Sequence, residues 1–89
     1  MVSVTTSNNG ETLAQAAMGQ WLRVIRFNAE QDLTNQLLQL GLLPGDCLRI
    51  VRAAPLGGPL LVEFNGRSVA LGREVAVKII VEEGKCASH

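Results

Sequence analysis

The sequence predicts a mainly β fold, in which about five short antiparallel strands form a small, strongly curved barrel and one α-helix lies between the first and second strands. Length is the first reason, because 89 residues are enough for one domain with one core. Pattern is the second, since one segment has helical periodicity and several short β-branched segments lie between turn signals. Only 3% of the residues are aromatic, so aliphatic side chains must build most of the core.

The first half of the chain contains one predicted strand and the predicted helix. Residues 1–11 are polar and are expected to be a disordered segment, followed by the domain at 12–83 and a flexible tail at 84–89. A short lead-in turn precedes the segment WLRVIRF, which is rich in β-branched and aromatic residues. This segment, residues 21–27, is therefore predicted to be the first strand.

The segment NAEQDLTNQLLQLG has the clearest helical pattern in the chain. Asn28 is the expected N-cap, and Gln31 three residues later completes a capping-box pattern. Gly41 is the expected left-handed residue that ends the helix. Three leucines recur at i, i+4 and i+7 and define the face that should be buried: Leu33, Leu37 and Leu40.

Two turn signals organise the second half of the chain. Pro44 followed by Gly45 fits the central positions of a type II turn, because proline presets φ and glycine tolerates a positive φ. Asn65 followed by Gly66 lies between the alternating segments LLVEF and RSVAL, which is the strongest short-range signal for a β-hairpin. We therefore predict two strands joined by a tight turn.

The remaining segments complete the predicted barrel. Residues 46–52 alternate between apolar and polar side chains, as in a half-buried strand. Residues 54–59, with the sequence APLGGP, are a predicted loop, residues 72–78 fit a single helical turn, and residues 79–81 form a last short strand. Five strands, one helix and a single turn before the last strand indicate a barrel of the SH3-like kind.

Charge and hydropathy exclude two classes of protein. Eight basic and eight acidic residues cancel, so the basic excess of a nucleic-acid-binding protein is absent. The longest uncharged stretch, residues 33–45, has 13 residues and falls short of the ~20 apolar residues that span a bilayer. The segment MVSVTTSNNG has neither the basic start nor the apolar run of a signal peptide. We therefore expect a cytoplasmic protein that is not embedded in a membrane.

No group of residues in the sequence forms a convincing active site. The single histidine, His89, is the C-terminal residue, where nothing would orient it as a general base. No two carboxylates are placed as an acid and base pair. The loop APLGGP lacks the following helix and the lysine of a phosphate-binding loop. We therefore expect that the protein is not an enzyme.

The chain has two cysteines and one histidine as candidate ligands for a zinc site. Cys47 and Cys86 could form a redox pair, and Cys86 with His89 gives a Cys-x-x-His spacing. A structural zinc site needs four ligands at recognisable spacing, and disulfides are rare in cytosolic proteins. We therefore expect two unpaired thiols, one in a strand and one in the tail, and assign no metal site.

Four arginines are candidates for a catalytic residue that acts on a nucleotide-hydrolysing partner. Such an arginine finger must be exposed, and the sequence predicts exposed side chains for Arg26, Arg52, Arg67 and Arg73. Exposed arginines on strands are more often ordinary soluble surface. Ordinary surface charge is the expectation for all four.

The second half of the chain has a series of short motifs at regular spacing: a predicted helix that ends Leu-x-x-x-Gly-Leu-x-Pro-Gly, then a strand, then Ala-Pro-Leu-Gly-x-Pro and an alternating hairpin. The residues are Leu37, Gly41, Leu42, Pro44, Gly45, Ala54, Pro55, Leu56, Gly57 and Pro59. In this series the chain resembles the FeoA family, small cytosolic proteins of bacterial ferrous iron transport, in which the residue after the helix glycine is Leu or Met. The segment TLAQAAMGQ also resembles the family's opening, so the resemblance covers residues 12–82.

The resemblance implies a fold, a function and an alternative. It implies an SH3-like barrel and a non-enzymatic accessory protein that regulates FeoB, the iron permease with a cytosolic GTP-hydrolysing G-domain. The same kind of domain stands at the C-terminus of DtxR-type iron-dependent repressors. The alternative is therefore a stand-alone metal-responsive regulatory domain, for which Fe²⁺ is the candidate ion and Cys47, Cys86 and His89 the residues that would matter.

Small barrels bind partners through end loops and exposed strand edges, and two segments here are more apolar than their structure needs. These are the corner GLLPG with the preceding leucine, and the loop APLGGP. The candidate partner-binding residues are Leu38, Leu42, Leu43, Pro55, Leu56, Gly57 and Pro59. Leu42 and Leu56 could equally plug one end of the barrel. Self-association into a homo-oligomer through the same patches is also compatible with this pattern.

Overall fold

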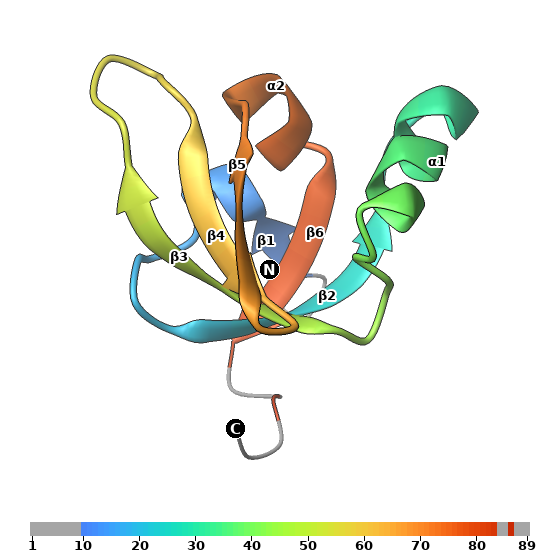
Figure 1. The fold of residues 1–89 in the computed structure, drawn as a ribbon, viewed down its shortest axis with the longest axis horizontal. Coiled ribbons are helices and arrows are strands. Elements are labelled where there is room, and N and C mark those ends of the chain that lie inside the picture. Colours follow the sequence, from blue (N-terminus) through green and yellow to red (C-terminus); the bar gives the residue numbers. More distant parts are fainter. Residues whose placement is uncertain (1–9, 84–85, 87–89) are drawn as a thin grey trace, which may run out of the picture.

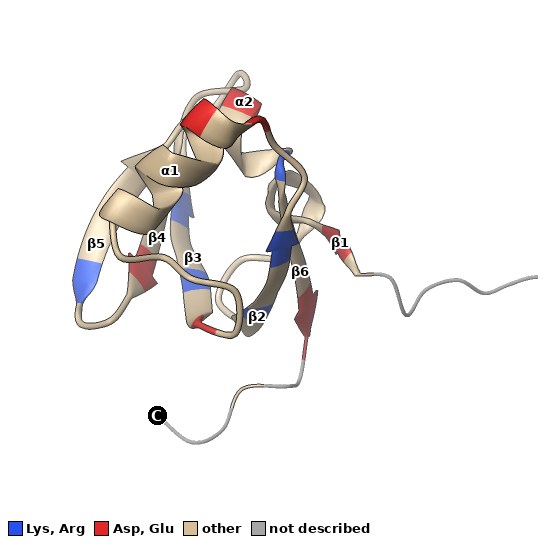
Figure 2. Cartoon of the chain, turned by 90° about the vertical axis from the view of Figure 1, so that its right-hand side faces the viewer, with Lys and Arg blue, Asp and Glu red and all other residues tan. Residues whose placement is uncertain are grey.

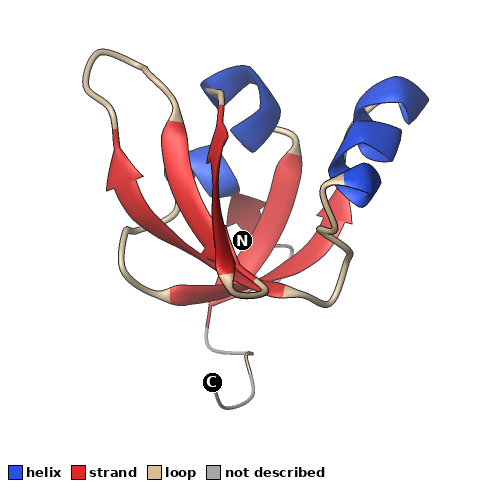
Figure 3. Ribbon diagram, viewed as in Figure 1, coloured by secondary structure: helices blue, strands red, loops and turns tan. Residues whose placement is uncertain are grey.

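A computed structural model describes residues 10–83 and Cys86 as one strongly curved β-sheet with helices along one rim (Figures 1 and 3). The elements are β1 (Glu11–Thr12), η2 (Leu13–Gln15), β2 (Trp21–Phe27), α1 (Gln31–Gln39), β3 (Cys47–Ala53), β4 (Leu60–Phe64), β5 (Arg67–Leu71), α2 (Arg73–Ala76) and β6 (Ile79–Glu83). Of the leading segment expected at 1–11 and the tail expected at 84–89, only Gly10, Glu11 and Cys86 are among the described residues. Glu11, placed in the leading segment by the sequence, is already part of the first strand.

Six strands pair antiparallel in the order β1-β6-β2-β3-β4-β5. The prediction of a mainly β, SH3-like fold is confirmed; the sixth strand is the two-residue β1, so α1 follows the second strand. Two irregularities in register, after Val24 in β2 and after Ile50 in β3, bend the long strands. Because a bulge increases the local twist, these two positions help the sheet curve around its own core.

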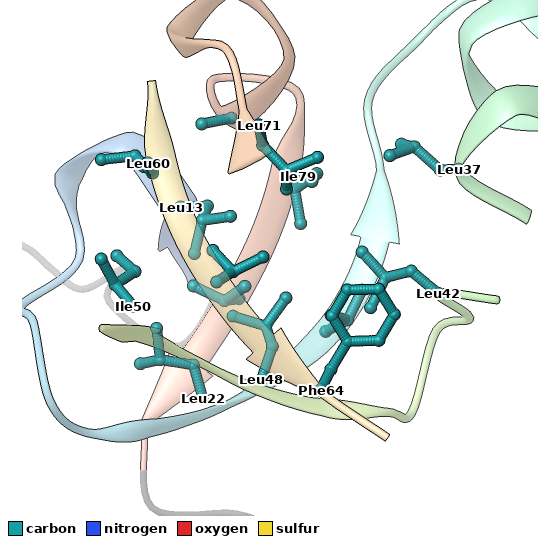
Figure 4. Packing of buried hydrophobic residues seen from close by; sticks show 14 residues of the cluster. Leu13, Leu22, Leu37, Leu42, Leu48, Ile50, Leu60, Phe64, Leu71 and Ile79 are labelled. Carbon is teal, nitrogen blue, oxygen red and sulfur yellow. The ribbon is translucent and has the colours of Figure 1, made fainter. Parts of the chain in front are cut away.

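The concave side of the sheet holds one apolar core, aliphatic except for Phe64 (Figure 4). Strand β4 shows the alternation that the sequence predicts, since Leu60, Val62 and Phe64 are buried and the residues between them are half-exposed. The other members of the cluster are Leu13, Leu22, Val24, Leu37, Leu42, Leu48, Ile50, Leu71, Ala76, Ile79 and Val81. Each large side chain buried in this way contributes about 1.5–3 kcal/mol.

Helix α1 begins later than its capping pattern predicts. Glu30, not Asn28, is the N-cap, and its side chain makes no capping hydrogen bond. The backbone N–H of Asn28 donates to the carbonyl of Lys78 at 2.7 Å, so Asn28 continues the end of β2. The prediction of an Asn28–Gln31 capping box was therefore wrong, because pairing of the sheet competes with the local cap.

The end of α1 follows the predicted chemistry. Gly41 has φ +92°, its N–H donates to the carbonyl of Leu38, and the N–H of Leu42 donates to the carbonyl of Leu37. This is the Schellman arrangement, in which the first residues after the helix turn back and pack on its last turn. Both Leu37 and Leu42 are buried, so this turn attaches the helix to the barrel.

Both predicted turns of the second half are present. Asp46 N–H donates to the carbonyl of Leu43 at 2.9 Å across Pro44 and Gly45, and Gly45 has φ +98°. Asn65 and Gly66 have φ +53° and +80°, as the tight turn between β4 and β5 requires. The single turn predicted before the last strand is α2.

The two cysteines are bonded to each other, so the expectation of unpaired thiols was wrong. Cys47 and Cys86 form a disulfide with an S–S distance of 2.01 Å and a sequence separation of 39. Strand β2 lies between β6 and β3 in the sheet, so the chain leaving β6 starts within reach of the beginning of β3. The pairing depends on this strand order, which no local sequence pattern reports.

Candidate functional site

The loop between β3 and β4 is the most exposed of the predicted partner-binding segments. Two backbone hydrogen bonds define it: Ala54 N–H donates to the carbonyl of Pro59 at 3.0 Å, and Gly58 N–H donates to the carbonyl of Pro55 at 3.1 Å. Leu56 and Gly57 are the two central residues between Pro55 and Gly58. Their φ values of +58° and +75° are those of a type I′ turn. The loop is therefore ordered by its own hydrogen bonds.

Leu56 is an unusual residue for the tip of such a turn. Its side chain is fully exposed, at 103% of the reference area, and its backbone lies in the left-handed region. That region costs about 1–2 kcal/mol for a residue with a β-carbon, and glycine or asparagine normally occupies it. Neither packing nor backbone geometry accounts for a leucine here. An exposed apolar side chain held in a costly conformation is typical of a contact with another molecule.

The base of the loop is attached to the body of the protein. Arg73, the first residue of α2, donates its Nε–H to the carbonyl of Gly58 at 3.0 Å. A β-carbon on Gly58 would lie 2.7 Å from the β-carbon of Ala54, so the two arms of the loop are in close contact. The turn that carries Leu56 is thus presented in a defined orientation.

The other predicted residues divide between a second surface and the core. Leu38 and Leu43 are 40% and 49% exposed, whereas Leu42 is fully buried as the alternative proposed. Figure 1 shows helix α1 and the β3–β4 loop on opposite sides of the barrel rim. The structure therefore does not bring all the predicted residues together: Pro55, Leu56, Gly57 and Pro59 share the loop, and Leu38 and Leu43 lie at the end of α1.

The hairpin β4–β5 is hydrogen-bonded to the end of α1, where the exposed Leu38 and Leu43 lie. Arg67 donates from Nη2 to the carbonyl of Leu40, and Asn65 donates from Nδ2 to the carbonyl of Gly41 at 3.2 Å. Carbonyls at a helix C-terminus have no partner within the helix and carry a partial negative charge, so a guanidinium is well suited to bind them. The corner after the helix is closed by Asp46, which accepts from the N–H of Leu43 at 2.9 Å.

One apolar hollow was not found from the sequence. Met18, Gly19, Arg49, Ile50 and Val51 line a shallow depression of about 380 Å³. Met18 and Val51 are 57% and 40% exposed. The N–H of Gly19 donates to the carbonyl of Ile50 at 2.9 Å and brings the two segments together. No sequence pattern reports this contact, because the segments are about thirty residues apart.

Charged residues occur on every strand (Figure 2), and none of those that the structure describes is buried. Arg23 binds Glu82 at 2.8 Å, and Arg49 binds Glu63 while its guanidinium lies 4.9 Å from the centre of the Trp21 ring. These pairs are partly exposed and contribute little to stability.

Two of the four arginines considered as fingers hold the fold together. Arg67 binds the end of α1 and Arg73 binds the β3–β4 loop. The side chains of Arg26 and Arg52 are exposed, and neither side chain makes a hydrogen bond or ion pair to any residue that the structure describes. Only these two retain the free side chain that an arginine finger needs.

The described residues offer no ready site for a metal ion. Within 10–83 and Cys86, no group of three or more histidine, cysteine or acidic side chains is placed to hold one. The two cysteine sulfurs are bonded to each other, and His89 lies outside the described residues.

No helix among the described residues is long and apolar enough to cross a membrane.

Comparison with known proteins agrees with this architecture. The FeoA domain model matches residues 11–83. A curated relative from Methanocaldococcus jannaschii, named "Putative Fe(2+) transport protein A", is 30% identical over 73 residues, which is 82% of this chain and 87% of the relative.

Solved structures show the same fold. Iron(II) transport protein A from Clostridium thermocellum superimposes with a TM-score of 0.76 at 30% identity, over 81% of this chain and 44% of that one. The FeoA protein from Chlorobium tepidum gives 0.74 at 33% identity, over 81% and 69% of the two chains. The Zn²⁺-bound regulator ScaR gives 0.78 at 22% identity, over 90% and 40%, and so shares the fold alone.

The family model covers most of the chain, and the curated relative is similar along nearly its whole length. The family consists of small accessory proteins of Fe²⁺ transport, not of enzymes. This chain therefore belongs to the FeoA family.

Proposed function

We propose that this chain is a cytoplasmic, non-enzymatic accessory protein of Fe²⁺ uptake that regulates an FeoB-type permease by binding its cytosolic G-domain. Family membership and the Fe²⁺ transport relatives support the process. The loop of residues 54–59 supports a binding role, since it places an apolar side chain in solvent on an ordered turn.

Leu56 is the observation that carries the proposal. A leucine in the left-handed region raises the free energy of the folded protein. Its fully exposed side chain buries no apolar surface that would offset this cost. Insertion of the same side chain into an apolar pocket of a partner would bury a whole leucine side chain, worth about 1.5–3 kcal/mol. The turn, fastened by Arg73, reduces the ordering cost of binding.

A binding measurement with purified components tests the proposal. The full chain is titrated against the cytosolic region of the FeoB-type permease from the same organism, and the variant Leu56→Asn is compared with the wild type. We expect saturable binding and at least a tenfold loss for Leu56→Asn, which keeps the left-handed backbone. Met18→Asn replaces another exposed apolar residue and should bind like the wild type. Absence of wild-type binding, with normal iron uptake in a deletion strain, would overturn the proposal.

The effect on the permease divides into two cases with different outcomes. If the protein acts by binding alone, GTP hydrolysis by the permease should change little when Arg26 or Arg52 of this protein is replaced by alanine. If one of these residues is an arginine finger, its replacement by alanine should reduce the stimulation of GTP hydrolysis by orders of magnitude, and lysine at that position should not restore it.

The exposed side chains of Leu38, Leu43 and Leu56 also predict concentration-dependent self-association, which sedimentation of the wild type would detect.

The alternative is a stand-alone metal-responsive regulatory domain. The shared fold with ScaR favours it, although that likeness concerns the fold alone. It requires ligands from Cys47, Cys86 and His89, and both sulfurs are bonded to each other in this structure. Titration of the reduced protein with Fe²⁺ or Zn²⁺ tests this role. Equal affinity in a variant with alanine at all three positions would remove it.

A further inference from the structure

The disulfide joins β3 to Cys86, which follows β6, and β3 and β6 are not neighbours in the sheet. Glu83, at the end of β6, pairs with Leu22 on one side of β2, whereas Cys47 pairs with Arg23 on the other side. The bond to Cys86 therefore holds the chain that leaves β6 against the beginning of β3. The Cys47–Cys86 bond is thus a crosslink across one end of β2, called the clasp below.

Both sulfurs belong to the outer side of the sheet, away from the core. Cys47 alternates with the buried Leu48 and Ile50 along β3 and is half-exposed, as is Cys86. Neither cysteine is a member of the buried cluster. Thiol–disulfide exchange requires access of an attacking thiolate to a sulfur, and this position provides it.

The residue that faces Cys47 across the ladder is basic and belongs to an ion pair. Arg23 is its direct partner across the β2–β3 ladder, and opposed residues in such a pair have β-carbons about 4.5–5.5 Å apart. Nε and Nη2 of Arg23 donate to Glu82 on β6, so the charge of this guanidinium is already paired and the site rests on access to the sulfurs. Cys86, beyond the last strand, is the sulfur that a reductant would attack.

We propose that Cys47 and Cys86 form a reversible thiol–disulfide exchange site whose substrates are dithiols, either small molecules or proteins of the Cys-x-x-Cys class. A thiolate of the dithiol attacks Sγ of Cys86, the Cys47–Cys86 bond breaks, and its electron pair leaves on Sγ of Cys47. The second thiol of the reductant then displaces Cys86 and closes its own disulfide. Two electrons pass to the protein, and each cysteine takes up one proton.

Opening the bond releases the clasp while the barrel remains. Fourteen buried residues build the core and neither cysteine is among them, so the reduced protein should keep its fold. Fe²⁺ persists where reductants are abundant, so a clasp that reductants open would match an accessory role in Fe²⁺ uptake. Only this connection between the clasp and Fe²⁺ uptake rests on the proposed function.

Trp21 offers a direct readout, because it is the only tryptophan in the chain. It lies two residues before Arg23 on the same side of β2 and contacts Arg49. The oxidised full chain is incubated with stepwise ratios of reduced to oxidised dithiothreitol or, in a second arm, with a reduced protein of the Cys-x-x-Cys class, and free thiols are then alkylated and counted from the mass of the intact protein. Circular dichroism, Trp21 emission and hydrogen exchange are recorded on the same samples.

We expect both thiols to be alkylated together, a changed Trp21 emission, and faster exchange at the ends of β2, β3 and β6 in a protein that is still folded. The melting temperature should fall by about 10–20 °C, because the bond closes a long loop. Reoxidation should restore all four signals. Resistance of the bond to excess dithiothreitol under native conditions would overturn the proposal, as would unfolding on reduction or unchanged emission and exchange.

Two variants separate the bond from other effects of the reductant. Cys86→Ser should show the emission of the reduced wild type whether or not reductant is present. Ser88→Ala changes the same tail and keeps both sulfurs, so it should behave as the wild type. A Cys86→Ser protein that still responds to dithiothreitol contradicts the site. If Cys86→Ser does not fold, the reduced wild type decides the question. None of these measurements involves a permease.

Discussion

The guanidinium of Arg67 fills the space that a side chain on Gly41 would occupy. A β-carbon at Gly41 would lie 2.5 Å from Nη2 of Arg67, and the same nitrogen donates to the carbonyl of Leu40. The glycine is therefore required by its φ of +92°, and any β-carbon here would also displace the guanidinium, which is the end of a flexible side chain. Through this contact the β4–β5 hairpin fixes the end of α1 and the exposed leucines beside it.

Gly41→Ala should lower the free energy of unfolding by about 1.5–3 kcal/mol, which combines the cost of a left-handed alanine with loss of the hydrogen bond from the displaced Arg67 to Leu40. Gly19→Ala is the matched control. Gly19 has a similar φ of +88°, but a β-carbon there would meet nothing within 4 Å. Its loss should stay at about 1–2 kcal/mol. Urea denaturation of both variants checks the prediction, and equal losses would contradict a steric role for Arg67.

Arg67→Ala should cost about 1–2 kcal/mol, because the carbonyl of Leu40 loses its charged donor and Phe64 loses the cation above its ring. The same change should cost less in the Gly41→Ala background, where it also removes the clash. Arg52→Ala removes an exposed arginine that binds nothing in the described chain and should stay within about 0.5 kcal/mol of the wild type. Additive losses in the double variant would show that the two residues act independently.

The neighbouring residues Leu42 and Leu43 should respond in opposite ways to truncation. Leu42 is fully buried below the end of α1, so Leu42→Ala should cost about 2–5 kcal/mol. Leu43 is 49% exposed, and Leu43→Ala should change stability by no more than about 0.5 kcal/mol. Thermal and urea unfolding of the two alanine variants provide the comparison. A large loss for Leu43→Ala would place that residue in the core.

The sequence was sufficient where the governing interactions are local. The alternation of β4, the Asn65–Gly66 turn and the end of α1 at Gly41 all depend on residues within a few positions of each other. The burial of Leu42 was also within reach, because the second residue after a Schellman helix end normally packs on the helix. That rule decides between the two positions that the sequence left open for Leu42, in the core or at the surface.

Long-range pairing explains what the sequence could not predict. The disulfide needs the β6-β2-β3 order, the start of α1 depends on the bond from Asn28 to Lys78, and the hollow at Met18 needs the bond from Gly19 to Ile50. The candidate binding residues were separated for the same reason. Their distribution over opposite sides of the rim depends on how the hairpin and the helix pack, and no motif encodes that.

Leu56→Asn should leave the fold intact and raise the free energy of unfolding by up to about 1 kcal/mol, because asparagine tolerates the left-handed region better than leucine does. Leu56→Val has the opposite expectation, a loss of about 1 kcal/mol or more, since β-branched residues are the least tolerant of a positive φ. The side chain itself contributes no burial that either change could remove. Urea denaturation of both variants beside the wild type gives the order Asn, Leu, Val. A clear loss of stability in Leu56→Asn would mean that this leucine serves the fold, and the case for a binding role would fail with it.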